Sequence, residues 1–140
     1  MQMIELERVG EHEFVASNGR GASVRIGRKG QEGSFSPVEL LVAAAAGCAL
    51  VTSETLVLRR TGGDQLSAVA DAVQSESGNE VISIPVTLSY DLSAVDDPEA
   101  LETVVRRAVE QFCTVTRTLK QSATAPLQLP MPLQTAVDPL

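Results

Sequence analysis

Two cysteines are the residues of this chain best suited to chemistry. Cys48 follows the small residues Ala43-Ala44-Ala45-Ala46-Gly47, and Cys113 follows Phe112 where a helical pattern ends or bends. A thiol near a helix N-terminus and an arginine such as Arg117 has a lowered pKa and more reactive thiolate at neutral pH. A buried cysteine can equally act as a small hydrophobic side chain, and Phe112 indicates a core position for Cys113. Both interpretations stay open for each thiol.

The other side chains point less clearly to a reaction. The single histidine, His12, falls in a turn, and one histidine with two cysteines cannot build a zinc site in one chain, so we expect no metal. No dinucleotide, phosphate-loop or nucleophile-elbow motif occurs, and we expect no cofactor. Three arginines, Arg20, Arg25 and Arg28, lie in the N-terminal region, where one could supply a fixed cation that favours a thiolate.

Composition narrows the class of protein. The 140 residues fit one domain, residues 1–140, and a net charge of −7 with 3% aromatic residues argues against nucleic-acid binding. The acidic start of the chain is unlike a signal peptide, and the longest apolar run, Leu40–Val51, is too short to span a membrane. We therefore expect a cytoplasmic protein that does not bind membranes. In that reducing compartment the cysteines would be free or redox-active.

The first predicted helix has clear end signals. Ser36 fits the N-cap, Pro37 the first helical position and Glu39 the acid of a capping box. The segment Arg59-Arg60-Thr61-Gly62-Gly63 ends it. From Leu40 to Val51 the helix is apolar on every face, so it should be surrounded by protein. A domain this small can hardly cover it alone, and we infer burial against the same helix of a second subunit.

Strands and a second helix complete the pattern. Alternation of apolar and polar residues predicts three strands before the first helix and two after it, around residues 4–6, 14–16, 24–26, 68–73 and 82–90, with Pro85 marking an edge or a bulge. Asp97 and Pro98 open a second helix with an apolar stripe of Leu101, Val104, Val105, Ala108, Val109 and Phe112. Thr114 or Thr116 could cap a short helix after it. A last extended segment aligns Leu127, Leu129, Met131 and Leu133. The order is βββ-α-ββ-α-β, in the α+β class.

Two segments resemble the OsmC/Ohr family of osmotically induced and organic-hydroperoxide-resistance proteins. They are Ser36-Pro37-Val38-Glu39-Leu40-Leu41 through Gly47-Cys48, and Cys113-Thr114-Val115-Thr116-Arg117-Thr118-Leu119. The likeness covers nearly the whole chain, with the two cysteines in family order and 65 positions apart. It implies an intertwined homodimer in which two long central helices lie buried between sheets.

The resemblance also implies roles for individual residues. Cys48 corresponds to the thiol that attacks a hydroperoxide, and Cys113 to the thiol that closes a disulfide, which a small dithiol or a lipoylated protein reopens. The family assists with an arginine and a glutamate. Arg20 best resembles that arginine, with Arg28 second. Val38 stands where the organic-hydroperoxide-resistance branch has its acid, and Glu39 is one place on, about 100° around the helix.

These observations favour a thiol-dependent peroxidase that reduces organic hydroperoxides or hydrogen peroxide through Cys48 and Cys113. Because Val38 replaces the expected acid, a non-catalytic dimer that binds a small apolar or thiol-reactive ligand is the alternative. A purely structural dimer is the third interpretation. The substrate, the reductant and the assisting residues are left open by the sequence.

Overall fold

The computed structural model describes residues 3–130, and it forms a mixed α+β fold. In chain order the elements are β1 (Glu5–Gly10), β2 (Glu13–Ser17), β3 (Ser23–Ile26), α1 (Pro37–Thr61), β4 (Leu66–Ala70), β5 (Val73–Gln74), β6 (Val81–Ser83), β7 (Val86–Tyr90), α2 (Pro98–Phe112) and α3 (Thr114–Leu119). The described part holds an antiparallel sheet β1-β2-β3 and the antiparallel pairs β4-β7 and β5-β6. The predicted α+β class is confirmed, and so is the sequence of three strands, a long helix, further strands and a second long helix.

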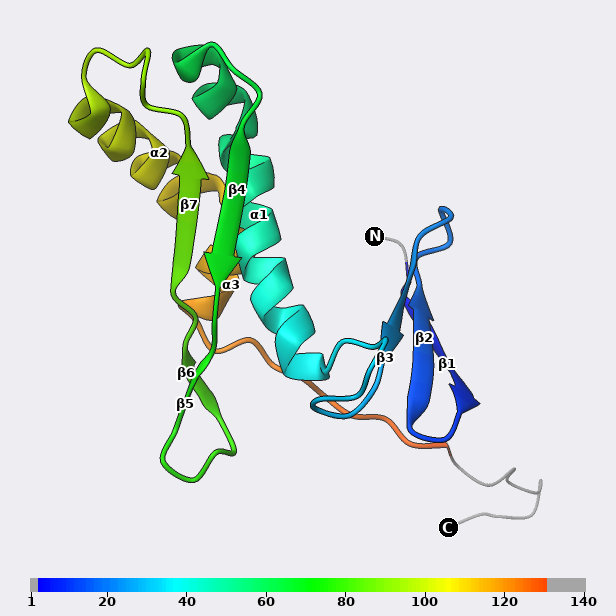
Figure 1. Cartoon of the computed structure of the whole chain (residues 1–140). Coiled ribbons are helices and arrows are strands. Elements are labelled where there is room, and N and C mark those ends of the chain that lie inside the picture. Colours follow the sequence, from blue (N-terminus) through cyan, green and yellow to red (C-terminus); the bar gives the residue numbers. More distant parts are fainter. Residues whose placement is uncertain (1–2, 131–140) are drawn as a thin grey trace, which may run out of the picture.

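The N-terminal sheet stands apart from the rest of the chain (Figure 1). Its β2–β3 turn is held by the Asn18 side chain, whose Oδ1 accepts the backbone N–H groups of Arg20 and Ala22. Several large apolar side chains of β1 and β2 are exposed, among them Leu6 and Phe14. Within the described part of the chain, this sheet therefore keeps apolar side chains exposed to solvent.

The first helix begins and ends as its local sequence dictates. The Ser36 hydroxyl accepts the Glu39 N–H at 3.1 Å, and Glu39 Oε1 accepts the Ser36 N–H at 2.7 Å, which completes the capping box. At the other end Gly62 adopts φ 73°, a left-handed conformation that costs a residue without Cβ little. Each end therefore satisfies backbone groups that the helix itself leaves unpaired.

The core lies where α1, α2 and the β4-β7 pair meet. Val57 of α1 and Leu101 and Val105 of α2 are buried together, and half-buried side chains such as Leu88 and Tyr90 of β7 pack against them. In Figure 1, α2 and β7 lie along the C-terminal half of α1. This cluster fixes the end of α2 and hence the position of Cys113.

The structure departs from the predicted elements in four places. The predicted strand at residues 68–73 is interrupted at residues 71–72, so β4 ends at Ala70 and Val73 belongs to the separate strand β5. The predicted strand at residues 82–90 is split at Pro85, which lacks an N–H for pairing, into the separate strands β6 and β7. The short helix after Cys113 exists, but Cys113 itself is its N-cap rather than Thr114 or Thr116. Residues 121–130 hold no strand, and Leu127 and Leu129 are exposed. Met131 and Leu133, the other half of that prediction, lie outside the described residues.

The single chain leaves much of α1 uncovered. Val51 is 80% exposed on this helix, and Val69 of β4 and Phe112 of α2 are 72% and 65% exposed. The expectation that Phe112 belongs to the core is therefore wrong for one chain, because within residues 3–130 no element covers the end of α2. By length and composition alone α1 is apolar enough to cross a bilayer, a test that core helices of water-soluble proteins also pass. One chain does not bury its own most apolar helix.

Candidate functional site

Cys48 lies near the middle of α1, on a surface of small residues. The thiol is half-buried, while the neighbouring Ala45 and Ala49 are 3% and 5% exposed. Thr52 follows Cys48 by four residues, so its hydroxyl lies on the same face of the helix one turn on. A Cβ built on Gly47 would meet nothing within 4 Å. No side chain or backbone of the same chain therefore packs closely against Gly47, which leaves space there for another chain.

Cys113 occupies the junction between α2 and α3 and is fully buried. Its backbone N–H donates to Val109 O at 3.0 Å, which closes the last turn of α2. Its φ and ψ of −75° and 105° then turn the chain into α3, which packs against α1. The bend carries the sulfur from the end of one helix to the side of another.

The two thiols meet across this junction. Burial acts to raise the pKa of the Cys113 thiol, but hydrogen bonding to Cys48 and to Thr116 outweighs it, so the pKa of Cys113 falls below its ordinary value. The Thr116 Oγ1 hydroxyl donates to Cys113 Sγ at 3.1 Å, and Thr52 adds a smaller effect of the same sign. Both cysteines are free thiols. The pair is reduced, and its two sulfur atoms lie within hydrogen-bonding reach of each other.

Arg117 does not act on the sulfur as the sequence suggested. Its Nη1 donates to Gln111 O at 3.0 Å and its side chain is exposed. This bond ties α3 back to the end of α2. The lowered pKa of Cys113 comes from uncharged donors rather than from a nearby cation.

Glu39 lies away from the thiols of its own chain. Nine residues separate it from Cys48, which is two and a half helical turns, or about 13 Å along the axis and on the opposite face. Its carboxylate also accepts the Ser36 N–H of the capping box. Within one chain Glu39 is therefore a capping residue.

The two candidate arginines belong to the N-terminal part of the chain. Arg20 is exposed in the β2–β3 turn. Arg28 is exposed in the loop before α1, where its backbone N–H donates to Gln31 Oε1. The sheet that carries Arg20 extends away from the helices (Figure 1). One chain brings Cys48 and Cys113 together and leaves these arginines elsewhere.

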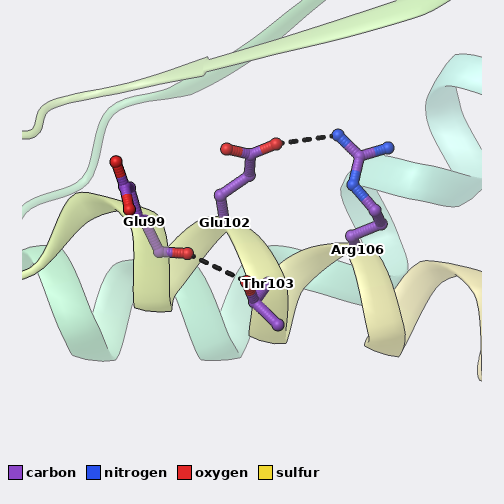
Figure 2. Close-up of polar contacts among 4 residues, drawn as sticks. All are labelled: Glu99, Glu102, Thr103 and Arg106. Carbon is purple, nitrogen blue, oxygen red and sulfur yellow. Dashed lines mark hydrogen bonds and ion pairs between the residues drawn. The ribbon is translucent and has the colours of Figure 1, made fainter.

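A cavity of 590 Å³ lies near the thiol pair, although neither cysteine lines it. Its walls come from α1, β7, α2 and α3, and include Ala45 and Ala49 next to Cys48 and Thr116 next to Cys113. Glu102 and Arg106 of α2 stand on its rim. Figure 2 shows their ion pair, with Arg106 Nη2 2.8 Å from Glu102 Oε1, and also the Thr103 hydroxyl donating to Glu99 O. The cavity thus combines apolar walls with a charged rim.

The sequence identified the thiols but not all of their polar partners. The sequence predicts Thr116 only as a possible helix cap, and it predicts no role for Thr52 at the thiols. The spacing of four residues between Cys48 and Thr52 was the available signal, because it places both on one helix face. Among residues 3–130, no group of three or more His, Cys, Asp or Glu side chains could hold a metal ion.

Comparisons with known proteins agree with this architecture. Residues 30–127 match the family model described as OsmC-like protein. An uncharacterized protein of Mycobacterium tuberculosis is 36% identical over 132 residues, which is 92% of this chain and 96% of that protein.

Solved structures show the same fold. An OsmC-like protein from Mycoplasma pneumoniae matches with a TM-score of 0.65 and 14% identity over 86% of this chain and 87% of its own. An OsmC-like hydroperoxide resistance protein from Jannaschia matches with a TM-score of 0.50 and 17% identity over 91% of both chains. The family model and the mycobacterial relative each cover most of the chain. This protein is a member of the OsmC-like family.

Proposed function

We propose that the protein is a thiol-dependent peroxidase that reduces organic hydroperoxides or hydrogen peroxide. The observation that carries this proposal is the meeting of Cys48 and Cys113, which are distant in sequence and reduced, with the pKa of Cys113 lowered. Two thiols within hydrogen-bonding reach can form a disulfide after a small movement. The OsmC-like family and the hydroperoxide resistance protein of the same fold support this choice of reaction.

The unequal exposure of the two thiols supports different roles for them. The half-buried Cys48 is the one that a peroxide reaches, whereas Cys113 is fully buried. The Cys48 thiolate attacks one peroxide oxygen and the O–O bond breaks. The second oxygen leaves as an alcohol, or as water from hydrogen peroxide, after taking a proton, and Cys48 becomes a sulfenic acid. Cys113 then closes the disulfide, and a small dithiol or a lipoylated protein reduces it again.

The cavity beside the thiols is the proposed place for the substrate. Its apolar walls suit the organic part of a hydroperoxide, and Ala45 and Ala49 leave room for it next to Cys48. The rim pair Glu102–Arg106 is solvated, so polar ends of a substrate can stay in water there. Hydrogen peroxide has no organic part to bind in such a cavity. Faster turnover of an organic hydroperoxide than of hydrogen peroxide would therefore support substrate binding there.

The active form is proposed to be an intertwined homodimer in the cytoplasm, with residues 1–140 acting as one domain. The exposed Val51 and the open space at Gly47 both lie on α1, as expected if a second copy of this helix packs there. The free N-terminal sheet could then reach across to its partner. In this arrangement Arg20, Arg28 or Glu39 would assist a thiol of the other subunit, which they do not reach in their own.

The test is catalytic consumption of an organic hydroperoxide with dithiothreitol as reductant. Turnover in Cys48→Ser should fall by at least about a hundredfold, since the sulfur is the nucleophile. Cys113→Ser should keep the first oxidation of Cys48 and lose rapid recovery. Full activity in Cys48→Ser would reject the proposal.

The alternative is a dimer that binds a small apolar or thiol-reactive ligand without turnover. It is favoured by the position of Glu39, which lies on the face of α1 opposite Cys48 and so does not assist that thiol within its own chain. An inert Cys48 together with saturable binding of an apolar ligand would support it.

A further inference from the structure

The hydroxyl of Thr116 has an unusual partner for a threonine on a helix. It donates to the sulfur of Cys113 at 3.1 Å. Threonines on helices commonly turn the hydroxyl to a carbonyl four residues earlier. Thr118 does so toward Thr114 O at 2.8 Å, and Thr103 toward Glu99 O at 3.0 Å. Thr116 is directed to the thiol instead.

Burial of the Cys113 sulfur makes this hydrogen bond important for any negative charge on it. Cys113 is fully buried, so water cannot solvate a negative charge on it. A buried thiolate then depends on protein donors, and hydrogen bonds to charged acceptors are about twice as strong as neutral ones. Thr116 is half-buried and also lines the 590 Å³ cavity, so it stands between the cavity and the sulfur.

We propose that Thr116 is a positioning residue of the thiol pair, whose hydroxyl orients the Cys113 sulfur toward Cys48 and stabilises it as a thiolate. The proposal deepens the proposed peroxidase function. In the step concerned, the Cys113 thiolate attacks the sulfur of the Cys48 sulfenic acid, the S–S bond forms and the S–O bond breaks. Hydroxide leaves and takes up a proton. Thr116 acts in this second step, through Cys113, and not in the attack on the peroxide.

The experiment uses the full chain with one thiol removed. In a Cys48→Ser background, thiolate formation at Cys113 is followed by absorbance near 240 nm as the pH is raised. The chain has one tyrosine and no tryptophan, and burial raises the pKa of Tyr90, so little else titrates in this band at neutral pH. Thr116→Val removes the hydroxyl and keeps the branched shape, Thr116→Ser keeps the hydroxyl, and Thr118→Val is the matched control on the same helix.

The expected direction follows from the bond. A donor that favours the thiolate lowers the pKa, so its removal in Thr116→Val should move the titration midpoint to higher pH. Thr116→Ser should restore the midpoint, and Thr118→Val should leave it unchanged. An unchanged midpoint in Thr116→Val, or a failure of serine to restore it, would overturn the proposal. If circular dichroism shows that the valine variant is unfolded, Thr116→Ala takes its place with the same outcomes.

A second measurement separates this proposal from the peroxidase itself. With Cys48 present, one equivalent of peroxide is added and disulfide formation is timed. Thr116→Val should slow this step by about tenfold, as expected for loss of one hydrogen bond to a charged acceptor, with the first oxidation of Cys48 unchanged. If the protein does not react with peroxide, the proposed peroxidase function is wrong. The pH titration of Cys113 would still show whether Thr116 stabilises its thiolate.

Discussion

The two long helices begin in the same way and are used differently. Both α1 and α2 have a side-chain N-cap, Ser36 or Asp97, followed by a proline at the first position. The exposed face of α2 carries charged residues such as Glu102 and Arg106, and its apolar stripe meets the core. From Leu40 to Val51, α1 is apolar on every face, and Val51 is exposed. One chain buries the middle of the apolar stripe of α2, leaving Phe112 exposed at its end, and covers α1 far less completely.

This difference shows what one chain can stabilise by itself. A helix with one apolar stripe needs only one neighbour, whereas a helix that is apolar all round needs neighbours on every side. Cys48 lies on α1, the helix that one chain covers less. Cys113 lies at the end of α2, the helix that one chain covers better. The thiol pair therefore lies between the core that one chain packs by itself and the side of α1 that we expect a second copy to cover.

The largest loss of stability is expected for substitutions in the core between α1, α2 and the β4-β7 pair. Leu101 of α2 is 1% exposed and packs with Val57 and Val105. Leu101→Ala should lower the free energy of unfolding by about 2 to 5 kcal/mol, because it leaves a cavity in the core. Urea denaturation measures this loss. Leu92→Ala, at a side chain 44% exposed, is the control and should cost much less. Equal losses would mean that α2 is not held by this core.

The next effect concerns the exposed side of α1. If a second copy covers Val51, Val51→Glu buries an unpaired charge and should weaken the dimer by about 2 kcal/mol or more, roughly thirtyfold in Kd. Sedimentation at several concentrations measures this. Gln111→Glu adds the same charge to an exposed site on α2 and should leave assembly unchanged. Identical behaviour of the two variants would contradict the proposed dimer contact.

The smallest effect compares the two N-caps. Ser36→Ala removes a buried cap and breaks a reciprocal capping box, so it should cost about 1 to 2 kcal/mol of unfolding free energy. Asp97→Ala removes a single exposed bond to Ala100 N and should cost about 0.5 to 1 kcal/mol. Thermal and urea unfolding of both variants provide the comparison. A larger loss at Asp97 would show that the capping box contributes little to α1.

Prediction from sequence succeeded where the signals were local. Ser36, Pro37 and Gly62 fixed the ends of α1, and Asp97 and Pro98 the start of α2, because a cap is recognised by residues within one turn of it. It failed where the outcome depended on distant neighbours. Phe112 has the periodicity of a core residue and is exposed, since periodicity gives a face of the helix and not what lies over it. The role of Arg20 stays a prediction.

The sequence by itself determined the two thiols, the main helices and their ends, since these follow from residue chemistry and short-range hydrogen bonding. Only the tertiary structure decided that Cys48 and Cys113 meet, because the bend at Cys113 and the packing of α3 on α1 close a loop of 65 positions. It also decided that hydrogen bonds with Cys48, Thr116 and Thr52, and not Arg117, lower the pKa of Cys113 against the opposing effect of burial. A hydrogen bond to sulfur depends on atomic distance, which residue spacing across a chain bend does not define.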